Sequence, residues 1–229
     1  MKNFNILAVG RGFFLLAVLL ALSEVGGAAT DPRELGRAAC KGNLSNMSKI
    51  LDENPGIDVD AKDEFGRTAL MLAAECGEKN MVQFLIGKRA DVNAKDAESK
   101  TLLIYGVQGE NIDVVSIFIN KGLDLNAKDE AGHTALMWAV HLLNGPISKL
   151  LIEKRADVNA RAKDGASALI DAVRLGSFEC ARILIENGKA DVSFEDQEGK
   201  TALWYALDLK FDKIAELLRL NGAVISWSR

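Results

Sequence analysis

A short sequence phrase returns along this chain at an almost constant interval, and this regularity constrains the fold more than any other feature. The phrase KDEFGRTALMLAA begins at Lys62 and returns as KDEAGHTALMWAV from Lys128, with looser copies between and after them. Each copy holds one hydroxyl residue at the same place, and these residues follow one another at intervals of 33, 33, 33 and 34: Thr68, Thr101, Thr134, Ser167 and Thr201. A period of this length is typical of repeat proteins, in which one small unit is stacked several times.

A second phrase alternates with the first. It reads KRADVNAKD from Lys88 and KRADVNARA from Lys154, with looser copies from Lys121 and Gly188. A weaker copy of the first phrase precedes them, carried by Leu35, Ala38, Ala39 and Gly42. We therefore predict a repeat domain over residues 30–229 with six units, at about residues 31–63, 64–96, 97–129, 130–162, 163–195 and 196–229.

Each unit is predicted to hold a helix, a turn, a second helix and an extended loop. In the second unit, the Thr68 hydroxyl is placed to cap a helix whose apolar residues fall at helical spacing over residues 70–74. Gly77 suits the left-handed turn after that helix, and a second apolar set at helical period covers residues 81–86. One such unit is too short to bury its own apolar face, so several units must stack into an all-α solenoid.

These phrases resemble the ankyrin repeat. The resemblance is carried by Thr68-Ala69-Leu70-Met71 and Ala90-Asp91-Val92-Asn93, with their copies at 134–137 and 156–159, and it covers residues 31–229. It implies helix-turn-helix units with short extended hairpin loops.

This chain departs from the family pattern in two ways. The proline and the histidine of the family phrase are replaced throughout, the histidine by apolar residues. The glycine that ends the first helix is also replaced in three units, by Glu110, Leu143 and Lys210. Because those residues enter a left-handed conformation less readily than glycine does, we expect displaced or longer turns there.

The resemblance further implies that a partner protein binds to the inner face, which we define as the loop tips together with the exposed side of each first helix. Apolar residues among charges, such as Phe65, Leu142 and Leu175, are typical of an interface centre, although single exposed apolar residues occur on any protein surface. Carried over residue by residue, the predicted partner-binding residues are Phe65, Arg67, Glu75, Lys100, Gln108, His133, His141, Leu142, Asp164, Arg174, Leu175, Lys200, Asp208 and Leu209.

The first 29 residues do not follow the repeat and have the three parts of a secretory signal peptide. Lys2 and Arg11 precede an unbroken apolar run over residues 13–22, and small residues follow it up to Ala29, after which we predict cleavage. Ten apolar residues are too few to cross a bilayer as a helix, which needs about 20. We expect a periplasmic or secreted protein without stable membrane insertion; the alternative is a retained leader that makes the chain a membrane-tethered adaptor.

The histidines and cysteines offer little chemistry. His133 and His141 are the only two histidines, and no third ligand stands at a metal-binding spacing, so we interpret them as solvated and expect no metal or cofactor; the alternatives are a shared ligand or a pH-sensitive contact. Three cysteines are too few for a disulfide framework. Cys180 takes a core position, while Cys40 and Cys76 are interpreted as free thiols, with a bond between them in an oxidising compartment as the alternative.

Two further sets of residues recur with the unit and are interpreted as structural. Aspartates at the start of successive loops are expected to form turns that bond their own backbone: Asp63, Asp96 and Asp129. One first-helix position carries aromatic residues that we expect in the core: Tyr105, Trp138 and Tyr205.

Composition narrows the choice of partner. A net charge of −4 gives no reason to expect nucleic acid, whose binding proteins usually carry a concentrated positive patch. The predicted function is a non-catalytic, monomeric scaffold that binds another protein and either inhibits it, as an immunity protein does, or stabilises it. The competing function is a thiol-dependent enzyme that uses Cys40 or Cys76.

Overall fold

The computed structural model describes residues 32–224, and within that range twelve helices form six pairs. The predicted leader at residues 1–29 lies outside the described residues. The all-α solenoid predicted from the repeat is confirmed, and the loops of residues 32–224 contribute isolated antiparallel bridges only. The helices are α2 (Pro32–Cys40), α3 (Leu44–Glu53), α4 (Ala69–Glu75), α5 (Lys79–Gly87), α6 (Leu102–Gln108), α7 (Ile112–Asn120), α8 (Ala135–His141), α9 (Gly145–Glu153), α10 (Ala168–Arg174), α11 (Phe178–Glu186), α12 (Ala202–Asp208) and α13 (Asp212–Leu220).

The recurring hydroxyl residues begin the first helices, as predicted. In the first helices α4, α6, α8, α10 and α12, the hydroxyl oxygen of the capping residue accepts a hydrogen bond from the backbone N–H three residues later, over 3.2–3.4 Å. Most of the second helices begin instead at a polar cap: Asn43, Asn111, Asn144 and Ser177. Satisfying these N–H groups at fixed places in each unit makes the short helices begin in register.

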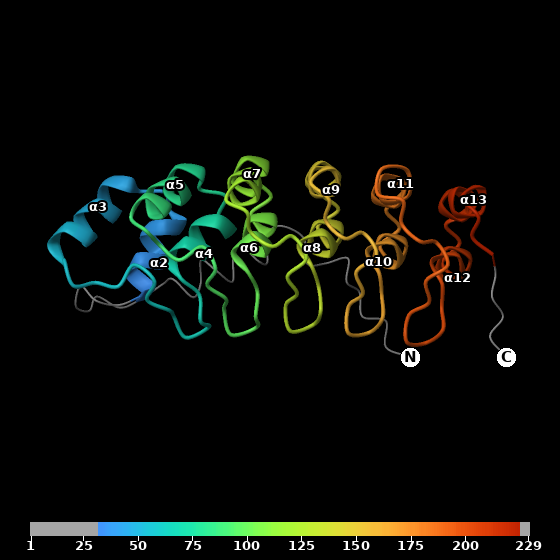
Figure 1. Cartoon of the computed structure of the whole chain (residues 1–229), viewed down its shortest axis with the longest axis horizontal. Coiled ribbons are helices and arrows are strands. Elements are labelled where there is room, and N and C mark those ends of the chain that lie inside the picture. The colour runs from blue at the N-terminus through green and yellow to red at the C-terminus, as the bar shows by residue number, and fades with distance from the viewer. Residues whose placement is uncertain (1–31, 225–229) are drawn as a thin grey trace.

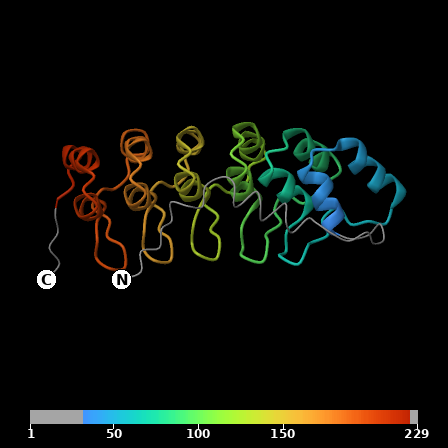
Figure 2. The same ribbon diagram turned by 180° about the vertical axis from the view of Figure 1, so that it is seen from behind.

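The helices form two rows with the loops to one side. Figure 1 shows the second helices in an upper row, the first helices below them, and the loops projecting from the first-helix side. Figure 2 shows the same row of loops from behind. α4 packs between α2 and α6, and α10 packs between α8 and α12. The apolar residues between the rows, such as Leu70, Ile104 and Met137, are at most 1% exposed and belong to one continuous core.

The turns after the first helices are alike in the units that have lost the family glycine, so the expected displacement is wrong. In each of these turns, as in those with glycine, a backbone N–H bonds the carbonyl three residues earlier, for example Leu143 to Val140 over 2.9 Å. The residue at this point has a positive φ in every case: Gly77 at 71°, Gly176 at 68°, Glu110 at 53°, Leu143 at 56° and Lys210 at 60°. The unit therefore imposes the left-handed conformation on residues that do not favour it.

Neighbouring loop tips are bonded to one another. The Ala97 N–H donates to the Phe65 carbonyl over 3.0 Å, and equivalent bonds join the next loops along the chain. Gly66, with φ at 76°, allows this approach, because a Cβ at that place would lie 2.7 Å from the Ala97 nitrogen. Within one loop, Asp63 Oδ1 accepts hydrogen bonds from the N–H groups of Phe65 and Arg67, both over 2.9 Å. The prediction that these aspartates bond their own backbone is confirmed.

A disulfide bond joins Cys40, at the end of α2, to Cys76, at the end of α4, with their Cα atoms 5.2 Å apart. The preferred interpretation of two free thiols was wrong. The two cysteines are at neighbouring positions in successive units, and the close packing of α2 on α4 brings them together. Cys180 is buried in the core as predicted, and burial raises the pKa of its thiol. Within residues 32–224, no helix has the length and apolar character needed to cross a membrane.

Candidate protein-binding surface

Three positions recur on the inner-face side of the second to sixth units, and some of them carry buried side chains. The residue before the helix cap is Arg67, Lys100, His133, Ala166 or Lys200 in successive units. The fourth residue of the first helix is Leu72, Tyr105, Trp138, Asp171 or Tyr205. The last residue of the first helix is Glu75, Gln108, His141, Arg174 or Asp208. Because the units stack in register, each position becomes a row of side chains along the solenoid.

An aromatic residue bonds a loop aspartate in three units. The Tyr105 hydroxyl donates to Asp96 Oδ2 over 2.6 Å, and the Trp138 indole N–H donates to Asp129 Oδ2 over 2.9 Å. The corresponding bond in the last unit, from Tyr205 to Asp196, is 2.7 Å long. The other oxygen of each aspartate accepts from the loop backbone, so one carboxylate fixes both loop and helix.

The core interpretation of these aromatic residues holds fully only for Tyr105, which is 3% exposed. Burial, with the bond to Asp96, raises the pKa of the Tyr105 hydroxyl. Trp138 and Tyr205 pack on the core but are only partly buried, although the loop aspartates that they bond are themselves buried. They therefore contribute ring edges to the inner face.

The fifth unit breaks this pattern at both positions. Ala162 stands where the other units have the loop aspartate, and Asp171 stands where they have an aromatic or apolar residue. Asp171 is only 6% exposed. One of its oxygens lies 3.2 Å from His141 Nε2 and the other lies 3.6 Å from the Arg174 guanidinium. The unit thus replaces the bond between ring and loop aspartate with contacts from Asp171 to a histidine and an arginine.

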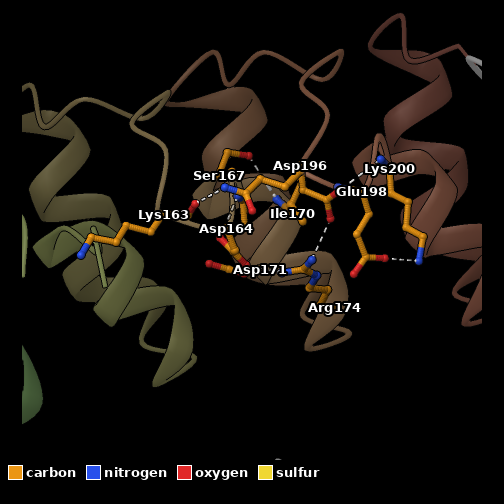
Figure 3. A network of polar contacts seen from close by, with 12 residues as sticks. Lys163, Asp164, Ser167, Ile170, Asp171, Arg174, Asp196, Glu198 and Lys200 are labelled. Atoms are coloured by element: carbon orange, nitrogen blue, oxygen red, sulfur yellow. Dashed lines mark hydrogen bonds and ion pairs between the residues drawn. The ribbon is translucent and has the colours of Figure 1, made fainter. Parts of the chain in front are cut away.

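Arg174 links the fifth unit to the sixth. Figure 3 shows its side chain turned from α10 toward Asp196, which lies 2.8 Å away. The same guanidinium bonds the Tyr205 hydroxyl over 2.8 Å and Asp164 over 3.2 Å. Burial alone would raise the pKa of Asp196, but the bonds from Tyr205 and the backbone, with the charge of Arg174, lower it overall. The cluster is therefore a fixed group of charges and not a set of loose surface side chains.

The two histidines meet on this surface. Their ring centroids are 5.0 Å apart and nearly perpendicular, and the Trp138 ring packs edge-on against both. The side chains of His133 and His141 are 24% and 29% exposed, so both reach solvent, but they also contact each other and His141 contacts Asp171, which the interpretation of two solvated residues did not include. Asp171 lies with them as a possible third ligand. Sequence spacing could not show this, because Asp171 belongs to the next unit.

The predicted partner-binding residues differ in how far they reach solvent. Phe65 and Leu209 are 52% and 42% exposed. Leu142 and Leu175 are half-buried at helix ends and pack on the core, whereas the neighbouring Leu143, which we did not predict, is 53% exposed. The other members with exposed side chains are Asp164 and Asp208, and those that are half-buried are Arg67, Lys100, Gln108, His133, His141, Arg174 and Lys200.

Glu75 is the predicted residue that solvent reaches least, with its side chain 8% exposed. Its Oε2 atom has no hydrogen-bond partner, and the nearest cation, Arg67, is 3.9 Å from it. Burial raises the pKa of this carboxyl, against the opposing charges of Arg67 and Lys100. Its placement suits a structural contact between helix and loop better than direct contact with a partner.

The thiols that a thiol-dependent enzyme would use are not available as nucleophiles in this structure. Cys40 and Cys76 are bonded to each other, and Cys180 is buried. A cysteine nucleophile must be ionised and accessible.

Comparison with known proteins gives a consistent result. A family model described as ankyrin repeats in three copies matches residues 14–96, 35–129, 91–162 and 136–226. An ankyrin repeat domain from Acinetobacter baumannii AYE is 29% identical, with 85% of this chain and 100% of that chain covered and a TM-score of 0.74. A chain from the complex of a predatory endopeptidase with an immunity protein, from Bdellovibrio bacteriovorus, is also 29% identical; 82% of this chain and 97% of that one are covered, with a TM-score of 0.72. None of the curated proteins matches the sequence.

Proposed function

The chain belongs to the ankyrin repeat family, and we propose that it is a non-catalytic scaffold that binds and inhibits an exported enzyme, in the manner of an immunity protein. The observation that carries this proposal is the likeness, over 82% of this chain, to a chain from a complex of an endopeptidase with an immunity protein. Ankyrin repeats form interaction surfaces, so the inner face is where we place the enzyme.

Two features support a location outside the cytoplasm. The first 29 residues have the order of a secretory signal peptide. The Cys40–Cys76 disulfide is the kind of bond that persists in oxidising compartments and is rare in the cytosol. Mass spectrometry of the protein from its native host tests both points, since we expect a chain that begins after Ala29 and contains one disulfide.

The charged groups of the inner face support tight binding by a preformed surface. Arg174 is held by several partners, and Lys200 lies 2.6 Å from Glu198 with its amine over the Trp204 ring. Side chains that are already fixed lose little conformational freedom when a partner binds. Phe65, over which the Arg67 guanidinium lies, adds an exposed aromatic anchor near one end.

The experiment that tests this function uses an exported enzyme that co-purifies with the chain and is identified by mass spectrometry. We expect the activity of that enzyme to fall with one equivalent of the chain. Phe65→Ala combined with Lys200→Ala should weaken the inhibition at least tenfold, whereas Phe178→Ala, which removes an exposed aromatic side chain at the start of the second helix α11, should leave it unchanged. A rise in enzyme activity would instead support a stabilising role, and equal inhibition by all variants would show that the enzyme binds elsewhere.

A further inference from the structure

We propose that His133, His141 and Asp171 form a binding site for a transition metal ion of the zinc class, with at least one coordination position open to an outside ligand. The three side chains can each offer one ligand atom, and these atoms all lie within 4.8 Å of one another. The inference does not depend on the inhibitory function, because a metal ion would bind whether or not the chain inhibits an enzyme.

The spacing is close to that of a tetrahedral site. With bonds of about 2.0–2.1 Å, the ligand atoms around zinc are about 3.4 Å apart. His141 Nε2 and Asp171 Oδ2 are already 3.2 Å apart. The ligand atoms lie within 4.8 Å of one another, so the His133 ring has to approach this pair by up to about 1.4 Å, through a rotation of a side chain that is 24% exposed. Two imidazoles and one carboxylate are ligands that zinc accepts, with the fourth position left for water or another donor.

Three separate elements bring these ligands together. His133 lies in the loop before α8, His141 is the last residue of α8, and Asp171 is in α10 of the next unit. Both histidines of the whole chain are in this one cluster. Asp171 occupies the position where other units place a ring or a leucine, so the fifth unit supplies a carboxylate in place of a bulky apolar group. Each of the three backbone positions is fixed by the repeat.

Nearby groups support the ligands. Asp129 Oδ2 lies 3.8 Å from His133 Nδ1, which is too far for a hydrogen bond but places a carboxylate beside the His133 ring. Asp129 is itself held by the Trp138 indole N–H and by the His133 backbone N–H. Trp138 packs against both imidazoles and limits their motion. The site thus has an ordered surrounding shell before any ion binds.

Two cations face the cluster and reduce, but do not abolish, its attraction for a divalent ion. Arg174 approaches Asp171 through Oδ1 at 3.6 Å, which leaves Oδ2 directed to His141. Arg174 is also paired with Asp164 and Asp196, so its charge is largely balanced elsewhere. The Lys100 amine lies over the Trp138 ring, 5.2 Å from its centroid. His133 and His141 are 24% and 29% exposed on the inner face, so a donor from a bound protein could reach the open coordination position of the proposed site.

The test uses the purified chain without a histidine tag, stripped of metal and titrated with Zn²⁺ by calorimetry and with Co²⁺ by visible absorption. We expect one ion per chain, a tetrahedral Co²⁺ spectrum, and shifts of both histidine ring signals in the NMR spectrum. His141→Ala and Asp171→Asn should each weaken binding at least about tenfold. Gln108→Ala, at the equivalent position of α6, is the matched control and should bind the ion as the parent chain does.

The proposal is overturned if the parent chain shows no saturable binding, or if His141→Ala binds as tightly as the parent. His141→Ala removes a half-exposed side chain, and a circular dichroism melt confirms that this variant folds. Loss of metal binding with unchanged enzyme inhibition would leave the function proposed above intact. Intact metal binding with no inhibition would contradict that function alone.

Discussion

At the scale of single residues, the repeat imposes backbone conformations that the side chains do not favour. Within residues 32–224, seven non-glycine residues have a positive φ, among them Glu110, Leu143 and Lys210 at the turns after first helices. A left-handed conformation costs a residue with a Cβ about 1 kcal/mol or more. The sequence shows that glycine is missing at those turns. It could not show that the stacking of neighbouring units keeps the same left-handed turn with other residues in place of glycine.

Leu143→Gly should stabilise the chain by about 1 kcal/mol, because glycine adopts a φ of 56° without strain and the leucine side chain is already 53% exposed. Urea denaturation measures the change. Gly176→Ala is the opposite variant at the equivalent turn of the fifth unit; its Cβ would lie 2.8 Å from the Phe211 ring, so we expect a loss of stability. A destabilised Leu143→Gly variant would contradict this account.

Glu75→Gln should raise the melting temperature at pH 7. Burial raises the folded-state pKa of Glu75 above 4.5, so folding favours its protonated form. Below its unfolded-state pKa, this carboxyl is protonated in both states and does not weaken the fold. As the pH rises through the folded-state pKa, the buried carboxyl must ionise, and the protein loses stability. The advantage of the neutral glutamine should therefore be present at pH 7 and absent at pH 4, which melting curves at the two pH values would show. Equal melting temperatures of Glu75→Gln and the parent chain at pH 7 would show that burial of the ionised Glu75 carboxylate does not cost stability.

At the scale of elements, the helices and their caps follow from the sequence, while the contacts between units do not. The hydroxyl caps and the apolar spacing recur within one unit, so local patterns are enough to predict them. The bond between Cys40 and Cys76, and the meeting of Asp171 with His141, depend on how two helices of different units face each other. Only the packed structure fixes those distances.

Arg174→Met should destabilise the junction of α10 and α12 by about 2 kcal/mol. The variant leaves Asp196, whose side chain is 1% exposed, with the Tyr205 hydroxyl and backbone N–H groups but without a cation. Arg182→Met is the matched control, because Arg182 pairs with Glu179 and Glu186 at the exposed surface of α11 and should leave the denaturation midpoint unchanged. Equal effects of the two substitutions would argue against a special role for the Arg174 cluster.

At the scale of the whole molecule, each unit packs mainly on its neighbours, so stability is distributed along the axis. The fold class could be predicted because the repeat recurs six times. The partner could not, because inner-face side chains are not dictated by the core, and their exposure depends on packing. Leu142 and Leu143 show this, since adjacent leucines differ in whether they pack on the core.

Replacing both Cys40 and Cys76 by serine should destabilise the first unit locally. The disulfide closes a segment with a sequence separation of 36, and loss of that closure costs up to about 4 kcal/mol in the chain-entropy account. Hydrogen exchange should therefore speed up in α2 and α3 while α12 and α13 keep their protection. Uniform acceleration over the whole chain would instead show that the solenoid unfolds as one cooperative block.

The hydrogen bonds between neighbouring loop tips have a mechanical consequence. Each tip is tied to the next by a bond such as that from Ala97 to Phe65, and the ties follow one another along the long axis. Tension applied between the two ends of the chain would load these ties in series, so that units open one after another and the molecule lengthens in steps. Because Cys40 and Cys76 bind the first two units covalently, these two units would stay joined at the disulfide while other junctions open.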